Sequence, residues 1–142
     1  MKKSLVEGPI SPQFIADSIA KHQTKTSIGA HQIFLGQVRA DEMDGKTVHA
    51  IEYSAHEEMA EQAFHSIRET TFELFPLTCM HIYHSIGEVK AGEICLFVFV
   101  SSAHREASNK AIVYLVEEIK KNVPIFGKEL FEDGTHVWKE NK

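Results

Sequence analysis

The pattern of apolar and polar residues predicts four principal strands, at residues 30–38, 48–54, 80–86 and 94–101, and the apolar density of the last two suggests burial on both of their faces. The Asp44-Gly45 dipeptide is a strong turn signal and predicts a hairpin between the first two of them. Gly87 and Gly92 bound the connection between the other two, which predicts a second hairpin. Gly36 interrupts the first strand, where we expect a bulge or a close backbone approach.

Helical spacing predicts three helices between these strands. Ser11-Pro12 has the form of an N-cap followed by proline and begins a short helix that ends at about Lys21. Residues 57–74 form a long helix with an apolar stripe at Met59, Ala63, Ile67, Thr70 or Thr71, and Leu74. A second long helix covers residues 105–123 and stops at Pro124. Residues 125–138 then predict two short strands around Asp133-Gly134, followed by a frayed tail at 139–142. The fold class is α+β, with helices on one face of a mixed sheet.

Composition bounds the possible functions. The chain has 142 residues, 43% hydrophobic and 25% charged, which fits a single domain over residues 1–142. Fifteen basic and twenty acidic side chains give a net charge of -5 without a basic block, so we expect no nucleic-acid partner. The longest apolar run, Ile94 to Val100, is far shorter than the about 20 residues of a membrane-spanning helix. The N-terminus lacks the apolar stretch of a signal peptide, and we expect a cytoplasmic protein without a membrane partner.

Cysteine and histidine spacing predicts no metal site. Cys79 and Cys95 belong to no Cys-x-x-Cys pair and read as buried, reduced thiols. The His56-Glu57-Glu58-Met59-Ala60 segment has Ala where a zincin helix has its second His. His81 and His84 are three residues apart in a predicted strand, which directs them to opposite faces.

Two places could carry chemistry. Ser101-Ser102-Ala103-His104-Arg105 leaves a strand and enters a helix, so its polar groups and the free helix N–H groups could bind an anion. The alternative is an ordinary serine-rich N-cap with a solvated arginine. Lys120 falls at the edge of the second long helix's apolar stripe, where partial desolvation could lower its pKa. The alternative is a lysine whose stem lies along the apolar surface while its amine stays in water. Lys121 points away and pairs with Glu117 on the helix surface.

Four blocks of sequence carry a family resemblance: residues 34–39 (Phe-Leu-Gly-Gln-Val-Arg), 86–88 (Ile-Gly-Glu), 101–105 (Ser-Ser-Ala-His-Arg) and 119–129. The last block contains Ile119-Lys120 and Val123-Pro124-Ile125-Phe126-Gly127-Lys128-Glu129. In order and spacing, from about Val6 to Trp138, the chain resembles the catalytic (large) subunit of molybdopterin synthase.

The resemblance implies an α/β hammerhead-type fold with two long helices and an additional small β subdomain. It implies a homodimer within a heterotetramer, whose small ubiquitin-like partner carries a thiocarboxylate on its C-terminal Gly-Gly tail. Sulfur passes to cyclic pyranopterin monophosphate, giving molybdopterin without a metal or organic cofactor. By position, Lys120 would be the principal catalytic lysine, and the substrate-binding residues would be Arg39, His104 and Arg105, with Gln37, Val38 and Gly127.

The chain departs from the family at one place. The family commonly reads Val-Pro-Ile-Trp-Lys-Lys-Glu, and here Phe126 and Gly127 replace the tryptophan and the first lysine. We expect a bulge at Gly127 that turns Lys128 into the pocket as a second catalytic lysine; on a regular strand Lys128 would face away. The departure motivates an alternative function, a catalytically weak paralogue that serves as a binding or assembly module for the ubiquitin-like partner. A third reading, a phosphate-ester hydrolase using His104 and Arg105, lacks an identifiable water-activating base or metal.

Overall fold

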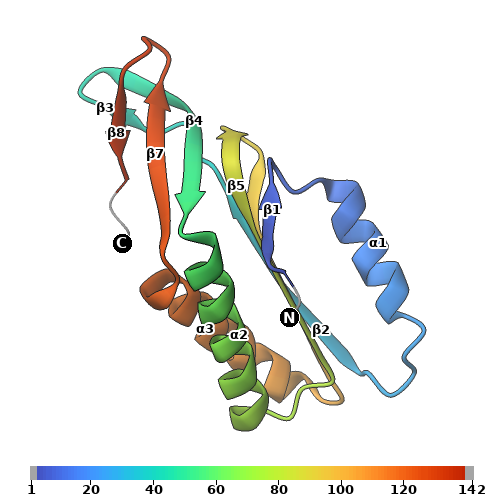
Figure 1. Ribbon diagram of the computed structural model, residues 1–142. Helices are drawn as coiled ribbons and strands as arrows, with labels where there is room; N and C mark the ends of the chain where they lie inside the picture. The colour runs from blue at the N-terminus through green and yellow to red at the C-terminus, as the bar shows by residue number, and fades with distance from the viewer. Residues whose placement is uncertain (1–2, 140–142) are drawn as a thin grey trace.

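The computed structural model describes residues 3–139 and contains three helices and eight strands in that range. The helices are α1 (Pro12–His22), α2 (Glu57–Leu74) and α3 (Arg105–Asn122). The strands are β1 (Leu5–Glu7), β2 (Ala30–Gln37), β3 (Glu42–Met43), β4 (Lys46–Ala55), β5 (Cys79–Lys90), β6 (Ile94–Ser102), β7 (Ile125–Phe131) and β8 (His136–Trp138). They form one sheet in the order β2-β6-β5-β4-β7-β8, with β1 beside β5 and β3 beside β4 (Figure 1). Only the β1–β5 pair is parallel among these strands, so the predicted mixed sheet and α+β class are confirmed.

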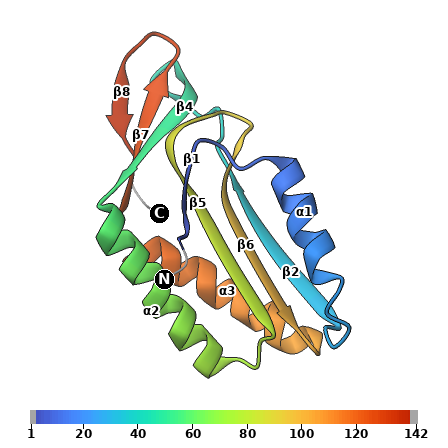
Figure 2. The same cartoon turned by 45° about the vertical axis from the view of Figure 1, so that its right-hand side comes forward.

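Helices cover both faces of the sheet rather than one. The long helices α2 and α3 lie on one face, while α1 lies apart from them on the other side (Figure 2). Ile15 of α1 packs with Phe97 and Phe99 of β6 in a second, smaller core. The expectation of one covered face was wrong because residues 95–102 of β6 are all buried. An apolar strand in the middle of a sheet needs cover on both faces.

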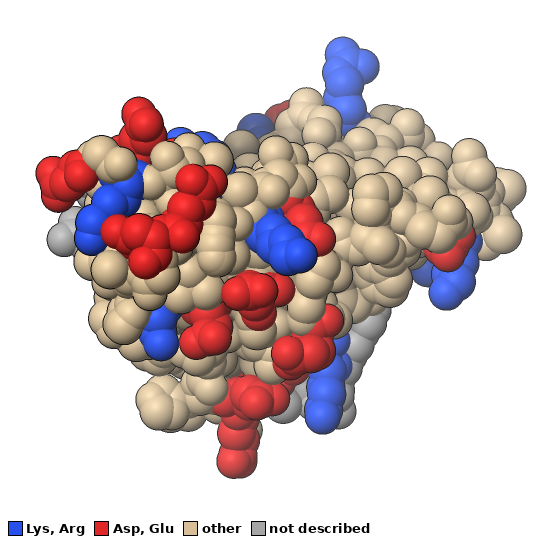
Figure 3. Space-filling view, turned by 90° about the horizontal axis from the view of Figure 1, so that it is seen from above, with Lys and Arg blue, Asp and Glu red and all other residues tan. Residues whose placement is uncertain are grey.

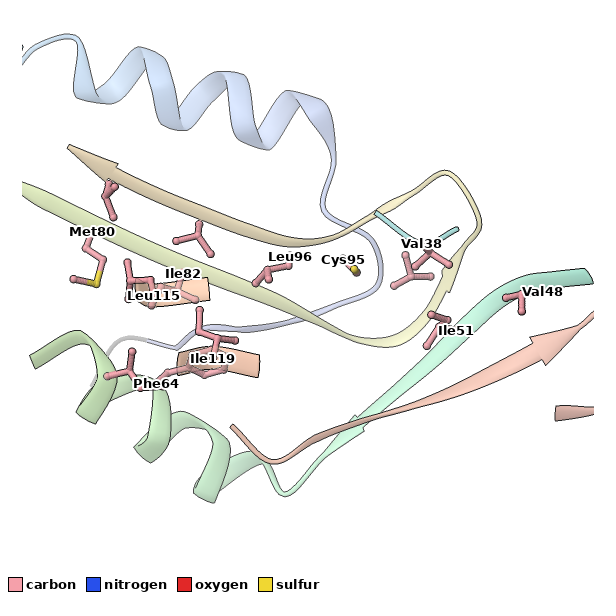
Figure 4. Close-up of a cluster of buried hydrophobic side chains, with 14 of the residues drawn as sticks. Val38, Val48, Ile51, Phe64, Met80, Ile82, Cys95, Leu96, Leu115 and Ile119 are labelled. Atoms are coloured by element: carbon pink, nitrogen blue, oxygen red, sulfur yellow. The ribbon is translucent and has the colours of Figure 1, made fainter. Parts of the chain in front are cut away.

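The larger core lies between the sheet and the two long helices. Phe64 of α2 and Leu115 and Ile119 of α3 pack against Met80 and Leu96 of the neighbouring strands (Figure 4). The buried stripe of α2 differs from the predicted one by about one position, and consists of Ala60, Phe64, Ile67 and Thr71. Met59 and Leu74 are more than half exposed. The series containing Phe64 is the buried one because an aromatic ring removes more apolar area from water than Met59 would.

One predicted hairpin is confirmed and the other is wrong. β5 and β6 pair as expected, with His84 opposite Leu96. The Asp44-Gly45 turn, whose residues both have positive φ, joins β3 to β4, whereas β2 pairs with β6. The turn residues determine the pairing only of the strand residues beside them, whereas the apolar residues of β2 pair with β6. The irregularity expected near Gly36 is present between Gly36 and Gln37.

The C-terminal strands extend the sheet as the small β subdomain that the resemblance implies. β7 pairs with β4 on one side and β8 on the other, and the turn between them contains Asp133-Gly134, as predicted. Lys139 follows β8, and its N–H donates to the Gly127 carbonyl oxygen of β7; residues 140–142 of the predicted frayed tail lie outside the described residues. Cys79 and Cys95 are buried free thiols, as predicted.

The surface agrees with the charge pattern of the sequence. Acidic and basic side chains are interspersed on the face shown in Figure 3, with no continuous basic patch on that face. No helix among residues 3–139 is long and apolar enough to cross a membrane.

Candidate active site

A cavity of about 430 Å³ opens where the C-terminal end of α3 meets the sheet. Val123-Pro124 ends the helix with an extended residue and leads the chain directly into β7. β7 then pairs with β4 so that Gly127 lies opposite Tyr53. The lining residues are Tyr53, His84, Ile119, Lys120, Lys121, Val123, Pro124, Ile125, Phe126, Gly127, Trp138 and Lys139.

Lys120 is the predicted site residue that the structure places in this cavity together with Gly127. Lys120 follows the buried Ile119 on α3 and is itself in contact with solvent. Burial around the amine lowers the pKa of Lys120 below its ordinary value, and the positive charge of Lys139 lowers it further. Lys121, predicted to lie on the outer surface, also borders the cavity.

The floor of the cavity is formed by the buried His84 and the half-buried Tyr53, which are both uncharged at neutral pH. His84 Nδ1–H donates to the Ser85 carbonyl oxygen at 2.8 Å, and burial lowers the His84 pKa to about 4, with a further contribution from Lys120. The Tyr53 ring meets the His84 imidazole edge to face at 5.1 Å. Burial, followed by Cys95, raises the pKa of Tyr53 above its ordinary value. Lysines above a neutral floor create a site that favours an anion.

The sequence pattern predicts neither floor residue: it indicates His84 only as a poor metal ligand beside His81, and Tyr53 only as a strand residue. The available signal was the period of β5, on which Met80, Ile82 and His84 share one face. Met80 and Ile82 belong to the core beneath α2 and α3, so His84 faces the same helices. Within the described residues, no cluster of three or more His, Cys, Asp or Glu side chains is arranged to hold a metal.

Gln37, Val38 and Arg39 lie at the end of β2, outside the lining of the cavity. Val38 is a core residue, 2% exposed. The Arg39 side chain is 75% exposed and forms an ion pair with Asp41 at 3.3 Å. Such an exposed pair contributes little stability, so the guanidinium can exchange Asp41 for another anion at low cost.

His104 and Arg105 lie at the other end of the β2–β6 pair, because Ala30 is opposite Ser102 in the antiparallel register. Both residues are exposed at the start of α3. The two preceding serine hydroxyls do not join them: Ser101 Oγ bonds to His31 Nδ1, and Ser102 Oγ donates to the His104 carbonyl oxygen. Any anion there would depend on the His104 and Arg105 side chains and the helix N–H groups.

The predicted cations therefore do not converge within one chain. β2 has eight residues, which separates Arg39 from the His104 end by about 25 Å. Along α3, a rise of 1.5 Å per residue places the α-carbons of Arg105 and Lys120 about 22 Å apart. Arg39 is nearer to the cavity, since Gly36, three residues before it, pairs with Leu96, which in turn pairs with the cavity residue His84.

The bulge predicted at Gly127 is absent. Pairing between β4 and β7 is continuous from Ala50–Leu130 to Ala55–Ile125, and the register shifts only between Val48 and Ala50. Lys128 therefore lies opposite Glu52, to which its amine is bonded at 3.5 Å, and outside the cavity lining. The regular pairing is stable because consecutive strand residues alternate between faces without strain. Without the bulge, the structure gives no support for Lys128 as a second catalytic lysine in the pocket.

The fold is α+β, and its pocket, bordered by lysines above a neutral floor, is electrostatically suited to a small anionic group. Residues 5–122 match the family model described as MoaE protein. A molybdopterin synthase catalytic subunit of Pyrococcus abyssi is 36% identical over 133 residues, covering 94% of this chain and 88% of that protein. The chain belongs to the MoaE protein family. The match to the family model ends at Asn122, before Gly127, Lys128 and the two C-terminal strands.

Solved structures support the same assignment. The crystal structure of molybdopterin synthase from Staphylococcus aureus superposes with a TM-score of 0.82 at 33% identity, covering 99% of this chain and 98% of that one. A complex of subunits 1 and 2 of molybdopterin-converting factor from Helicobacter pylori contains a chain with a TM-score of 0.81 at 16% identity, covering 98% and 90%. The second likeness concerns the fold alone. The hammerhead-type architecture implied by the sequence is thus confirmed.

Proposed function

We propose that this chain is the catalytic subunit of a cytoplasmic molybdopterin synthase. It would convert cyclic pyranopterin monophosphate to molybdopterin with sulfur from a small ubiquitin-like partner. The observation that carries the proposal is the position of Lys120, whose amine has a lowered pKa at the rim of a cavity with an uncharged floor. Membership of the MoaE family supplies the reaction class.

The proposed reaction requires cations and proton-transferring groups from this chain, and it does not require a nucleophile from it. The partner's thiocarboxylate would bring its own sulfur nucleophile, so Cys79 and Cys95 can remain buried. Lys120 would hold the anionic reacting groups and, because its pKa is lowered, exchange a proton more readily than an ordinary lysine. The transfer as proposed uses no metal or organic cofactor.

The rim of the cavity suits a thin peptide tail. Phe126 and Trp138 border the opening and are 47% and 56% exposed. A Gly-Gly tail has no side chains to clash with these rings and could pass between them towards Lys120. The Helicobacter pylori complex joins two subunits, and we propose a two-subunit assembly for this chain as well.

A homodimer would resolve the separation of the predicted cations. One chain cannot direct both Lys120 and Arg105 at a small pterin, because α3 holds them about 22 Å apart. A second copy could bring its own exposed His104 and Arg105 to the cavity of the first. We therefore assign the phosphate contact to Arg39 of one chain together with His104 and Arg105 of the other.

Reconstitution tests the proposal. The chain is mixed with thiocarboxylated partner and the cyclic phosphate substrate, and molybdopterin is measured. Product formation that depends on the thiocarboxylate supports the enzyme. Partner binding without product would instead favour the binding or assembly module that the change at Gly127 suggested.

A further inference from the structure

The position at which the family commonly has a lysine is occupied here by a glycine on the wall of the cavity. Gly127 lines the cavity opposite Tyr53, so a lysine at this position would face the reacting groups. The adjacent Lys128 does not replace it. Its amine lies 3.5 Å from Glu52 and 5.4 Å from the centre of the Trp138 ring, which together hold its charge.

Lys139 lies over the place that Gly127 leaves open. Its backbone N–H donates to the Gly127 carbonyl oxygen at 2.7 Å, which fixes its α-carbon beside β7. Its Cβ lies 3.7 Å from the point where a Cβ on Gly127 would be. Lys139 also lines the cavity, so its side chain and the missing one share the same region.

The space at Gly127 is small enough to explain why the cation comes from the segment after β8 instead of from β7. A Cβ at this position would lie 3.2 Å from Ile51 Cγ2 and 3.4 Å from Tyr53 Cε1, tighter than most real contacts in the first case. Glycine therefore allows β4, β7 and the segment after β8 to approach closely. In that arrangement Lys139 can reach the cavity without competing with a side chain from β7.

The charge of Lys139 is close enough to act on Lys120. Lys139 is among the groups that lower the pKa of Lys120, an effect that requires two like charges near one another. Two ammonium groups at one cavity bind an anion more strongly than either alone, and the first ligand relieves their mutual repulsion.

We propose that Lys139 is a second substrate-binding lysine of this active site, beside Lys120, and takes the place of the family lysine missing at position 127. The inference rests on the proposed function for the identity of the ligand, an anionic phosphate or thiocarboxylate group. Its role is electrostatic: Lys139 contacts the anion and adds its positive charge to that of Lys120 at the same cavity.

Single-turnover kinetics with thiocarboxylated partner and cyclic pyranopterin monophosphate test the role. Lys139→Ala should lower the rate about tenfold to a hundredfold, the usual effect of losing a charge-assisted contact. Lys139→Arg should retain most of the rate because it keeps the charge. Lys110→Ala, which removes an exposed lysine paired with Glu106 on α3, is the matched control. A wild-type rate for Lys139→Ala, or an equal loss for Lys128→Ala, would overturn the proposal.

A second readout separates this proposal from the proposed function. The titration of the Lys120 amine is followed by NMR in the chain alone, with Lys120→Ala identifying its signal. Lys139→Ala should raise the pKa of Lys120, whereas Lys128→Ala should leave it unchanged. An unchanged Lys120 pKa in Lys139→Ala overturns the shared cavity even if the enzyme is active. If Lys139→Ala raises the pKa of Lys120 but the wild-type chain makes no molybdopterin, the pairing of the two lysines stands and the proposed reaction is rejected.

Discussion

Acid should destabilise this protein through His84. The side chain is 6% exposed, and its Nδ1–H is bonded to the Ser85 carbonyl oxygen. Protonation would put a positive charge inside the fold near Lys120. In the unfolded chain the same imidazole is solvated and accepts a proton without this cost.

The magnitude follows from the change in the His84 pKa. Folding lowers it from 6.5 to about 4, so between these pH values the unfolded chain binds more protons than the folded one. The free energy of unfolding therefore falls as the pH decreases through this window and does not fall further through His84 below it. At about 1.4 kcal/mol per pKa unit, the full effect is about 3 kcal/mol.

Urea unfolding followed by circular dichroism at several values between about pH 7 and pH 4 measures the loss. His84→Gln has no titrating group and should show a shallower decline, so the difference between the two proteins isolates the imidazole. Other carboxylates and histidines contribute equally to both proteins. If the wild-type and His84→Gln stabilities ran parallel across this range, His84 would not be held neutral by burial and the description of the cavity floor would be wrong.

Three further predictions concern the active site. Lys120→Ala should abolish turnover with little effect on the unfolding midpoint, because the residue lies at a rim; a variant that keeps wild-type turnover would reject the assignment. Arg105→Ala should weaken substrate binding about tenfold to a hundredfold, and mixing it with Lys120→Ala chains should recover part of the turnover if the sites are shared between copies. Gly127→Lys should not raise turnover, since its Cβ would lie 3.2 Å from Ile51 Cγ2. Higher turnover in this variant would contradict the prediction and show that Ile51 can move to accommodate the side chain.

The elements of the fold were largely predictable because they depend on local patterns. Ser11 accepts a bond from the Phe14 N–H as an N-cap does, and α2 covers residues 57–74 as expected. The pairing of β2 was not predictable in the same way. The Asp44-Gly45 turn fixes only its own strand ends, while the partner of β2 is decided by contacts with β6, distant in sequence.

The candidate site was predictable where one element carries the chemistry. The helical period placed Lys120 at the edge of the apolar stripe, and the structure places it on the cavity. The floor residues were missed because their role depends on which strands and helices meet. His84 faces the cavity only because β5 lies beneath α3, and Tyr53 only because β4 pairs with both β5 and β7.

The proposed role of Lys139 shows why a position-by-position comparison with the family does not find the second lysine of the cavity. In such a comparison Lys128 is the obvious substitute for the lysine missing at position 127, because it is the next residue in sequence. A strand makes that choice unfavourable, since adjacent side chains point to opposite faces. Across the ladder, however, the segment after β8 is hydrogen-bonded to Gly127 and brings Lys139 to the same place. An anion responds to the position of a charge and not to the strand that supplies it, so the loss of a lysine from β7 does not by itself imply the loss of activity.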